Sequence, residues 1–341
     1  MVVRHFPTLI NFLLVLSLPA LSLGQGGPCK VLVTVGTVLE PSPGSSPYSR
    51  HPPRYPLPSL AVPVHGLSAD SFIAYDGRDP LPVLSVAPDD SARRFVIVPV
   101  LWPGTAQRWS KRGPALAGGA EHGAMAEPIT TAVRAILDKA RPQDSFGLLC
   151  AVGPPCSAPL GSARPALQAS LSQFAQAYLS QRSPSHTKVG RDVVLDAIDE
   201  AAGWFGPPQP GDAILLIGGF YRASRSKMRR VRVTLASRGI KLFLFGGGTY
   251  FEFSTLPMLY QNSPDLDLAI RTDGSNEEVG FAGPDATDEN LWLWRTEAEA
   301  LYDTATSGYV LLLPKTGPNV HIGVRGIEAS VGHVHPLPVC P

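Results

Sequence analysis

After an apolar run in the first 24 residues, hydrophobic and polar residues alternate, and longer apolar runs follow in the central part of the chain. Residues 30–40 alternate and are rich in β-branched side chains, which predicts a strand. Two short strands are expected at 72–75 and 83–86, around the Asp76-Gly77 pair that is typical of a hairpin turn. These segments predict a β region on the N-terminal side.

The central part alternates between apolar strands and amphipathic helices. The run FVIVPVL at 95–101 is continuously apolar, as expected for a parallel strand covered on both faces, and Pro99 is expected to mark its end. Further buried strands are expected at 146–152, 213–217 and 240–245, and helices at 129–140, 167–179, 193–204 and 226–237. Alternating strands and helices predict a doubly wound parallel sheet with helices on both faces.

The C-terminal part changes pattern. A helix is expected at 289–303, followed by strands at 309–313 and 321–324 with no helix between them. These strands cannot extend a parallel sheet without a crossover, so we expect them to form a small β layer with the N-terminal segments.

The first 24 residues have the layout of a signal peptide. Arg4 and His5 precede an almost wholly apolar run at 10–23, which ends in small residues. The run is shorter than the roughly 20 residues that span a bilayer, so a cleaved signal peptide is favoured, with a retained anchor left open. No later stretch is long and apolar enough to cross a membrane. We therefore predict a secreted or periplasmic protein with no membrane span after signal cleavage.

Four cysteines fit an exported chain, because an even number suggests two disulfides. Cys150 and Cys156 flank a Gly-Pro-Pro turn and are candidates for closing a short loop, while Cys29 and Cys340 lie at the two ends of the mature chain. Three connectivities are open, and no cysteine spacing indicates zinc. The net charge of +1 gives no overall field that would attract nucleic acid, so no nucleic-acid partner is expected.

Residues 66–80 (GLSADSFIAYDGRDP) resemble the run G-L-T-x-x-D-F-x-V-x-x-D-G-K-x-Q, which precedes the von Willebrand factor A domain in a family of exported bacterial proteins, the VWFA-related domain proteins. The downstream order is similar, with Arg-Pro-Gln-Asp at 141–144 and a run resembling G-I-x-L-F-x-F-G at 239–246. The resemblance covers roughly 60–248, with a weaker tail to 324. It implies a von Willebrand factor A-like fold for the parallel sheet.

Relatives in this family bind a divalent metal at the carboxyl ends of the strands, through an Asp-x-Ser-x-Ser motif, a Thr and an Asp. In this sequence the first motif falls on 99–104 (PVLWPG), which holds no carboxylate or hydroxyl. The Thr position falls on Asp192, and the last falls on Ile217-Gly218-Gly219. One carboxylate is a poor site for Mg²⁺, so we predict no bound metal and no other cofactor.

The resemblance and the residues together predict an exported binding module that contacts a protein or a surface ligand without metal. Tryptophan is enriched at binding hot spots, and two tryptophans lie in the loop after the first parallel strand. The expected contact surface is the carboxyl edge of the sheet, near Trp102, Trp109, Asp192, Gly218 and Phe220. No nucleophile elbow or metalloprotease motif is present, so no catalytic residue is assigned.

Two alternatives remain open. A hydrolase would place its site in the long loops at 103–127 or 250–290, and a metal-dependent adhesin would require misaligned ligands such as Thr105 or Thr187. A basic run is a further candidate, for binding a polyanion, and comprises Arg222, Arg225, Lys227, Arg229, Arg230 and Arg232. We expect these side chains to spread around their helix, which favours a solvated face over a site.

The whole sequence predicts an α/β protein: a doubly wound, von Willebrand factor A-like parallel sheet, with a small β layer from the N- and C-terminal segments. The expected parts are the signal peptide at 1–24, an N-terminal β segment at 25–92, the core of the α/β domain at 93–250, a loop and helix completing that domain at 251–307, and a C-terminal β segment at 308–341 that packs with the N-terminal one.

Overall fold

The structure is a computed structural model, and it describes most of the central and C-terminal chain. The described residues are 28–38, 61–100, 126–151, 156–180, 192–218, 224–247, 276–279, 287–317, 319–326, 329–331 and 335–336. Within them, no helix has both the length and the apolar character needed to cross a membrane.

A six-stranded sheet forms the centre of the fold, in the order β12-β11-β10-β7-β8-β9. Its strands are β7 (Arg94–Pro99), β8 (Ser145–Leu149), β9 (Ser157–Ala158), β10 (Ala213–Ile217), β11 (Lys241–Gly247) and β12 (Asn276–Val279). All neighbours pair in parallel except β9, which is antiparallel to β8. The chain order reverses between β7 and β10, which makes their carboxyl ends the topological switch point of the sheet.

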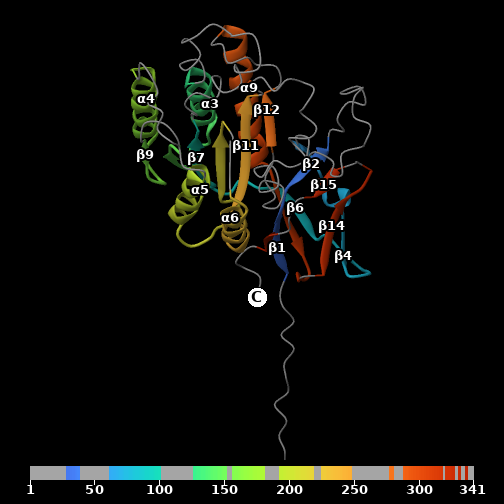
Figure 1. Cartoon of the computed structure of the whole chain (residues 1–341). Helices are drawn as coiled ribbons and strands as arrows, with labels where there is room; N and C mark the ends of the chain where they lie inside the picture. Colours follow the sequence, from blue (N-terminus) through green and yellow to red (C-terminus); the bar gives the residue numbers. More distant parts are fainter. Residues whose placement is uncertain are drawn as a thin grey trace, which may run out of the picture.

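Helices cover both faces of this sheet, because its strands are apolar on both sides. Phe95 and Ile97 of β7 pack in one core and Val96 and Val98 in the other, as alternation along a strand requires. The first core is shared with α3 (Ala126–Lys139), α4 (Arg164–Ser180) and α9 (Asp288–Thr306), and the second with α5 (Val193–Trp204) and α6 (Arg225–Ser237). Figure 1 shows these helices around the sheet, beside a separate group of β strands.

Strands from the two ends of the chain form that second group, as three small sheets in the orders β16-β1-β13-β6, β14-β4-β5 and β15-β2-β3. The N-terminal strands are β1 (Cys29–Val33), β2 (Val35–Val38), β3 (Ala61–Pro63), β4 (Phe72–Asp76), β5 (Asp79–Leu81) and β6 (Ser85–Pro88). The C-terminal strands are β13 (Tyr309–Leu313), β14 (Val320–Val324), β15 (Ala329–Val331) and β16 (His335–Pro336).

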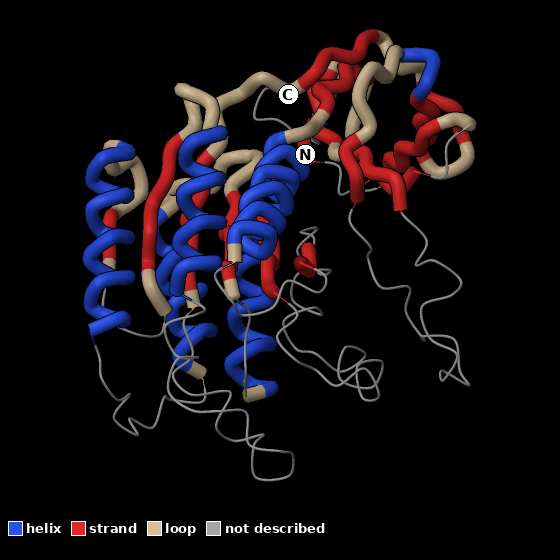
Figure 2. The backbone as a smooth tube through the Cα atoms, turned by 90° about the horizontal axis from the view of Figure 1, so that it is seen from above, coloured by secondary structure: helices blue, strands red, loops and turns tan. Residues whose placement is uncertain are grey.

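Each of the three small sheets joins an N-terminal strand to a C-terminal strand in antiparallel register. Val31 of β1 lies opposite Leu311 of β13, and both are buried with Phe72 and Tyr309 in a third core. Figure 2 shows these strands gathered beside the helical part. The predicted fold class, a doubly wound parallel sheet with a β layer from both ends of the chain, is confirmed; the exact domain boundaries stay predictions.

Two details of the N-terminal β region were predicted wrongly. The run at 30–40 is two strands, β1 and β2, which break at Thr34 and enter different sheets. The turn at Asp76-Gly77 joins β4 to β5, whereas the segment expected at 83–86 forms β6, which pairs with β13. Pro80 hid β5 from the pattern, since proline is tolerated only at sheet edges and β5 is an edge strand.

Candidate functional site

The carboxyl edge of the parallel sheet is closed by backbone contacts at the switch point. The amide of Val100 donates to the carbonyl of Ile217 at 2.8 Å, and the amide of Gly218 donates to the carbonyl of Phe245 at 2.7 Å. Gly218 has a φ of +108°, and a Cβ built there would lie 2.5 Å from the carbonyl oxygen of Val100. Only glycine therefore fits at this position, because a side chain would be strained and would collide with backbone.

Asp192 lies at the same edge and links two helices. It is the N-cap residue of α5, and its carboxylate accepts hydrogen bonds from the amide of Ser224 at 2.6 Å and from its hydroxyl at 2.8 Å. Ser224 in turn caps α6 by accepting from the amide of Lys227 at 3.3 Å. The carboxylate makes no cap bond to α5 itself, but it ties the start of α5 to Ser224 at the start of α6, where a negative charge is also favoured by the helix dipoles.

A disulfide between Cys150 and Cys156 stabilises the neighbouring connection between β8 and β9. Their Cα atoms are 5.2 Å apart, and the amide of Cys150 donates to the carbonyl of Cys156 at 3.0 Å. The amide of Ala151 donates to the carbonyl of Pro99 at 3.1 Å, which holds the hairpin against the end of β7. This disulfide confirms one predicted pair. Cys29 is also disulfide-bonded, while Cys340 lies outside the described residues.

The residues expected to form the contact surface are only partly placed. Asp192 and Gly218 both lie at the carboxyl edge, as the topology of α5 and β10 requires. Trp102, Trp109 and Phe220 lie outside the described residues. The binding role of all five residues stays a prediction.

The described residues at this edge do not fit a divalent cation. Pro99, Val100 and Gly218 offer only backbone atoms, and the carboxylate of Asp192 already accepts two bonds from Ser224. In the described part of the chain, no group of three or more histidine, cysteine or acidic side chains is placed to hold a metal. Hard cations require several oxygen ligands around one point, so the family's metal chemistry has no support from these residues.

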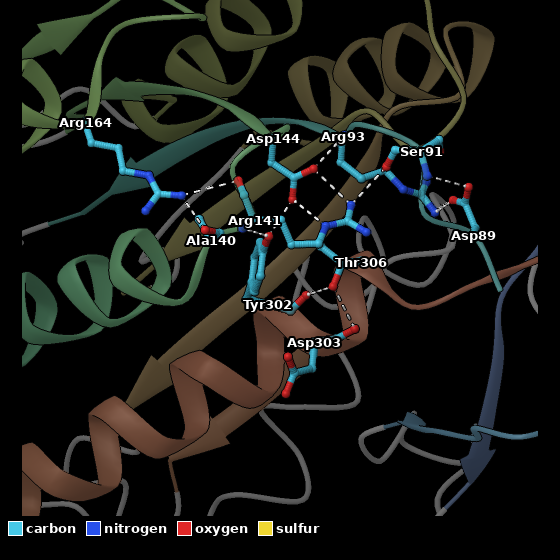
Figure 3. Close-up of polar contacts among 10 residues, drawn as sticks. All are labelled: Asp89, Ser91, Arg93, Ala140, Arg141, Asp144, Arg164, Tyr302, Asp303 and Thr306. Atoms are coloured by element: carbon cyan, nitrogen blue, oxygen red, sulfur yellow. Dashed lines mark hydrogen bonds and ion pairs between the residues drawn. The ribbon is translucent and has the colours of Figure 1, made fainter.

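Charged side chains gather instead at the opposite, amino edge of the sheet, around Asp144 (Figure 3). The side chain of Asp144 is fully buried and accepts from the amide of Arg93 at 2.9 Å and from the hydroxyl of Tyr302 at 2.5 Å. Arg141 donates to both carboxylate oxygens, at 2.9 and 3.0 Å, and also to the carbonyl of Ser91 at 3.0 Å. The Arg-Pro-Gln-Asp motif therefore fixes the start of β8 against β7 and α9.

Arg93 joins the α/β part to the small β sheets. Its buried guanidinium forms an ion pair with the buried carboxylate of Asp89, whose amide donates to the carbonyl of Gly308 at 2.9 Å. Burial lowers the pKa of Arg93, and Asp89 opposes that shift. The guanidinium fills the space beside Gly211, where a Cβ would lie 1.6 Å from Nη1. Sequence reasoning missed this contact because adjacent arginines normally indicate a surface.

Arg94 makes a second buried contact of the same kind. Its Nε and Nη2 donate to the two carboxylate oxygens of Asp212 at 2.7 and 2.6 Å, and Asp212 is 1% exposed. Arg94 also donates to the carbonyls of Phe205 and Pro207 at 2.7 and 2.8 Å. Paired bonds of this type fix geometry, so Arg94 locks the start of β7 to the start of β10.

The amino-edge network is suited to holding the fold together and poorly suited to acid–base catalysis. Burial and the hydrogen bond to Asp144 raise the pKa of Tyr302 to about 12, which keeps its hydroxyl protonated at neutral pH. Asp144 is saturated by donors, and Arg141 has its pKa raised by Asp144 against the opposing effect of burial. A general acid or base needs a pKa near the working pH, which Tyr302 and Arg141 lack.

Comparison with known proteins gives a likeness in structure only. No protein-family model matches the chain, and no curated protein is a detectable relative. A von Willebrand factor type A protein from Catenulispora acidiphila is 7% identical, with a TM-score of 0.40 over 92% of this chain and 74% of that one. An aerotolerance-related membrane protein from Bacteroides fragilis is 14% identical, with a TM-score of 0.37 over 62% of this chain and 98% of that one.

Proximal thread matrix protein 1 from the mussel byssus is 12% identical, with a TM-score of 0.38 over 69% of this chain and half of its own length. Identities and TM-scores this low support no inference about function. Membership of the von Willebrand factor A family therefore stays a prediction from the sequence motifs.

Proposed function

We propose that the chain is an exported binding module that contacts a protein or a surface ligand through the carboxyl edge of its α/β sheet, without a divalent cation. One observation carries the proposal. The sequence resemblance places two of the family's metal-ligand positions on Gly218, whose Cα faces backbone, and on Asp192, whose carboxylate is engaged by Ser224. The chain leaves β7 and β10 at this edge, and loops at such an edge are the usual place for contacts in this type of sheet.

The distribution of charge supports binding over catalysis. Among the described residues, the buried carboxylates Asp89, Asp144 and Asp212 all lie at the amino edge, and each is paired with an arginine. The described carboxylates at the carboxyl edge include Asp192, engaged by Ser224, and the exposed Glu127, Asp288 and Glu289 in the first turns of α3 and α9. Acid–base chemistry needs titratable groups that converge on a cleft, and these residues do not provide that arrangement.

Export is supported by the disulfide between Cys150 and Cys156. Disulfides persist in oxidising compartments and are rare in the cytosol. The bridge closes the hairpin next to the end of β7, beside the proposed contact edge.

Site-specific photo-crosslinking tests the proposal. The full chain is expressed in its native host with a photo-reactive amino acid at Trp102, Trp109 or Phe220, and adducts are compared with and without a chelator. We expect the same adduct in both conditions. The control position is Leu84, a 49%-exposed residue directly before β6 of the small β sheets, which is expected to give no such adduct. An adduct that disappears in chelator, or that forms equally from Leu84, contradicts the proposal.

A further inference from the structure

The cationic side chains of α6 fall into two groups, one engaged within the fold and one exposed. Lys227 pairs with Asp196 at 3.0 Å and Asp199 at 2.9 Å on α5, and these hydrogen bonds raise its pKa. Arg238, directly after the helix, donates to the carbonyls of Ala202 and Gly206 at 2.5 Å each. Arg232 is engaged as well. These cations pack α6 onto the fold.

The second group forms one continuous exposed face. Arg225, Arg229 and Arg230 are exposed and make no ion pair with any described residue, and Val233 beside them is 58% exposed. Arg225, Arg229 and Val233 recur every four residues and so lie along one side of the helix, and Arg230, three residues before Val233, lies beside them. We call this set the α6 arginine face. The basic side chains of α6 do point to different sides, as expected, and the exposed ones form this face.

The charges along α6 are unfavourable for the stability of the helix itself. The helix carries five cationic residues and no acidic ones, and its first turn contains no acid. Cations near a helix N-terminus are unfavourable, and like charges four residues apart, such as Arg225 and Arg229, repel. The carboxylate of Asp192, through Ser224, offsets this only at the cap. Arg225, Arg229 and Arg230 form no ion pair with the described residues that would offset this cost, and unfavourable local choices of this kind are expected at functional sites.

We propose that the α6 arginine face binds an acidic segment of a partner protein. Arginine is enriched at protein interfaces, and its planar guanidinium matches a carboxylate with two parallel hydrogen bonds. Val233 supplies an apolar contact among the three arginines. The nearby acids Asp196 and Asp199 are paired with Lys227, so they do not neutralise this face. The surface lies on the outside of α6: Arg225 follows Ser224 at the proposed contact edge, whereas Arg229, Arg230 and Val233 lie further along the helix, away from that edge.

Other anionic partners fit this face less well. Membrane docking requires a wide apolar helix face, and the large exposed side chain available here is a single valine. Nucleic-acid binding is normally accompanied by a strongly basic domain, whereas this chain has a net charge of +1. An acidic protein segment needs neither feature.

Fluorescence anisotropy with a fluorescein-labelled polyglutamate peptide tests the inference on the full chain. We expect saturable binding that weakens with added salt. Binding should weaken by about tenfold in the triple variant Arg225→Gln, Arg229→Gln, Arg230→Gln, as expected for three exposed charge pairs. Glutamine is a good helix former, so circular dichroism and thermal melting should show a folded variant.

A charge-matched variant separates a specific face from general electrostatics. Arg134, Arg295 and Arg325 are exposed on α3, α9 and the small β sheets, and their triple change to glutamine removes the same charge. This control should bind polyglutamate within about twofold of the unchanged chain. The inference is overturned if both variants weaken binding equally or if the unchanged chain does not bind polyglutamate at all. It is also overturned if the chain binds dextran sulfate, DNA or anionic vesicles more tightly than polyglutamate. The crosslinks from Trp102, Trp109 and Phe220 should still form in the triple variant of Arg225, Arg229 and Arg230. A loss of polyglutamate binding with these crosslinks retained separates this inference from the proposed function.

Discussion

Gly218 is the position at which the closed carboxyl edge can be perturbed most cleanly. Its φ of +108° is rarely adopted by residues with a side chain, and the Cβ of an alanine would lie 2.5 Å from the carbonyl oxygen of Val100. That oxygen belongs to backbone at the end of β7, so it cannot move aside as a flexible side chain would. Gly218→Ala therefore combines backbone strain with a steric collision.

The expected loss follows from these two contributions. An unfavourable backbone conformation contributes about 1–3 kcal/mol, and overpacking against a fixed neighbour contributes about 1–3 kcal/mol. Partial relaxation of the edge reduces the sum, so we expect Gly218→Ala to lower the free energy of unfolding by about 2–4 kcal/mol. Urea unfolding followed by circular dichroism measures this loss.

Gly203 provides the matched control for that experiment. It is exposed in α5, and a Cβ there would meet nothing within 4 Å. Gly203→Ala should leave the protein as stable or raise its stability by about 0.5 kcal/mol, because alanine favours helix. If the free energy of unfolding of Gly218→Ala lies within about 0.5 kcal/mol of that of the unchanged protein, the close contact described between Gly218 and Val100 is wrong.

Further predictions concern the amino-edge network and the disulfide. Asp144→Asn leaves Arg141 without a charged partner and should lower stability by about 2–4 kcal/mol in urea unfolding, whereas Asp303→Asn, at a half-exposed ion pair, should change it by under about 1 kcal/mol. Folding raises the pKa of Tyr302 from 10.0 to about 12, so the unchanged protein keeps its full stability below pH 10 and loses stability as the pH rises from 10 to 12. Tyr302→Phe, which has no hydroxyl to titrate, should lack this loss in urea unfolding measured across that pH range. Joint replacement of Cys150 and Cys156 by serine should lower the free energy of unfolding by about 2 kcal/mol and so lower the thermal midpoint. A thermal midpoint that changes neither with this replacement nor with added reductant would contradict a stabilising role of the disulfide.

The parallel sheet could be predicted from the sequence because its signals are local. The run at Ala213–Ile217 is apolar at every position, and all five residues are buried between two helical layers. Continuous apolar runs separated by amphipathic helices have few other stable arrangements. For the same reason, the end of β7 at Pro99 followed directly from the missing backbone donor of proline.

The small β sheets were harder because their partners are far apart in sequence. Val31 lies opposite Leu311, and Ala74 lies opposite Ile322 as well as Leu81. Short antiparallel strands gain their stability from such cross-strand neighbours, so the residues of one strand do not reveal its register.

Buried charges and exposed faces also depend on the tertiary structure. Arg93 and Asp144 are polar residues at strand starts, and only the convergence of β7, β8 and α9 buries them. The α6 arginine face likewise became visible once Lys227 was found paired with α5, which left Arg229 and Arg230 as a separate exposed group.

A calorimetric titration of the full chain with Mg²⁺ and Mn²⁺ tests the metal-free carboxyl edge most directly. We expect no saturable binding heat, because Asp192 is engaged by Ser224 and Gly218 offers no side-chain ligand. Saturable binding at micromolar concentrations that is lost in Asp192→Ala would contradict it and would favour a metal-dependent adhesin.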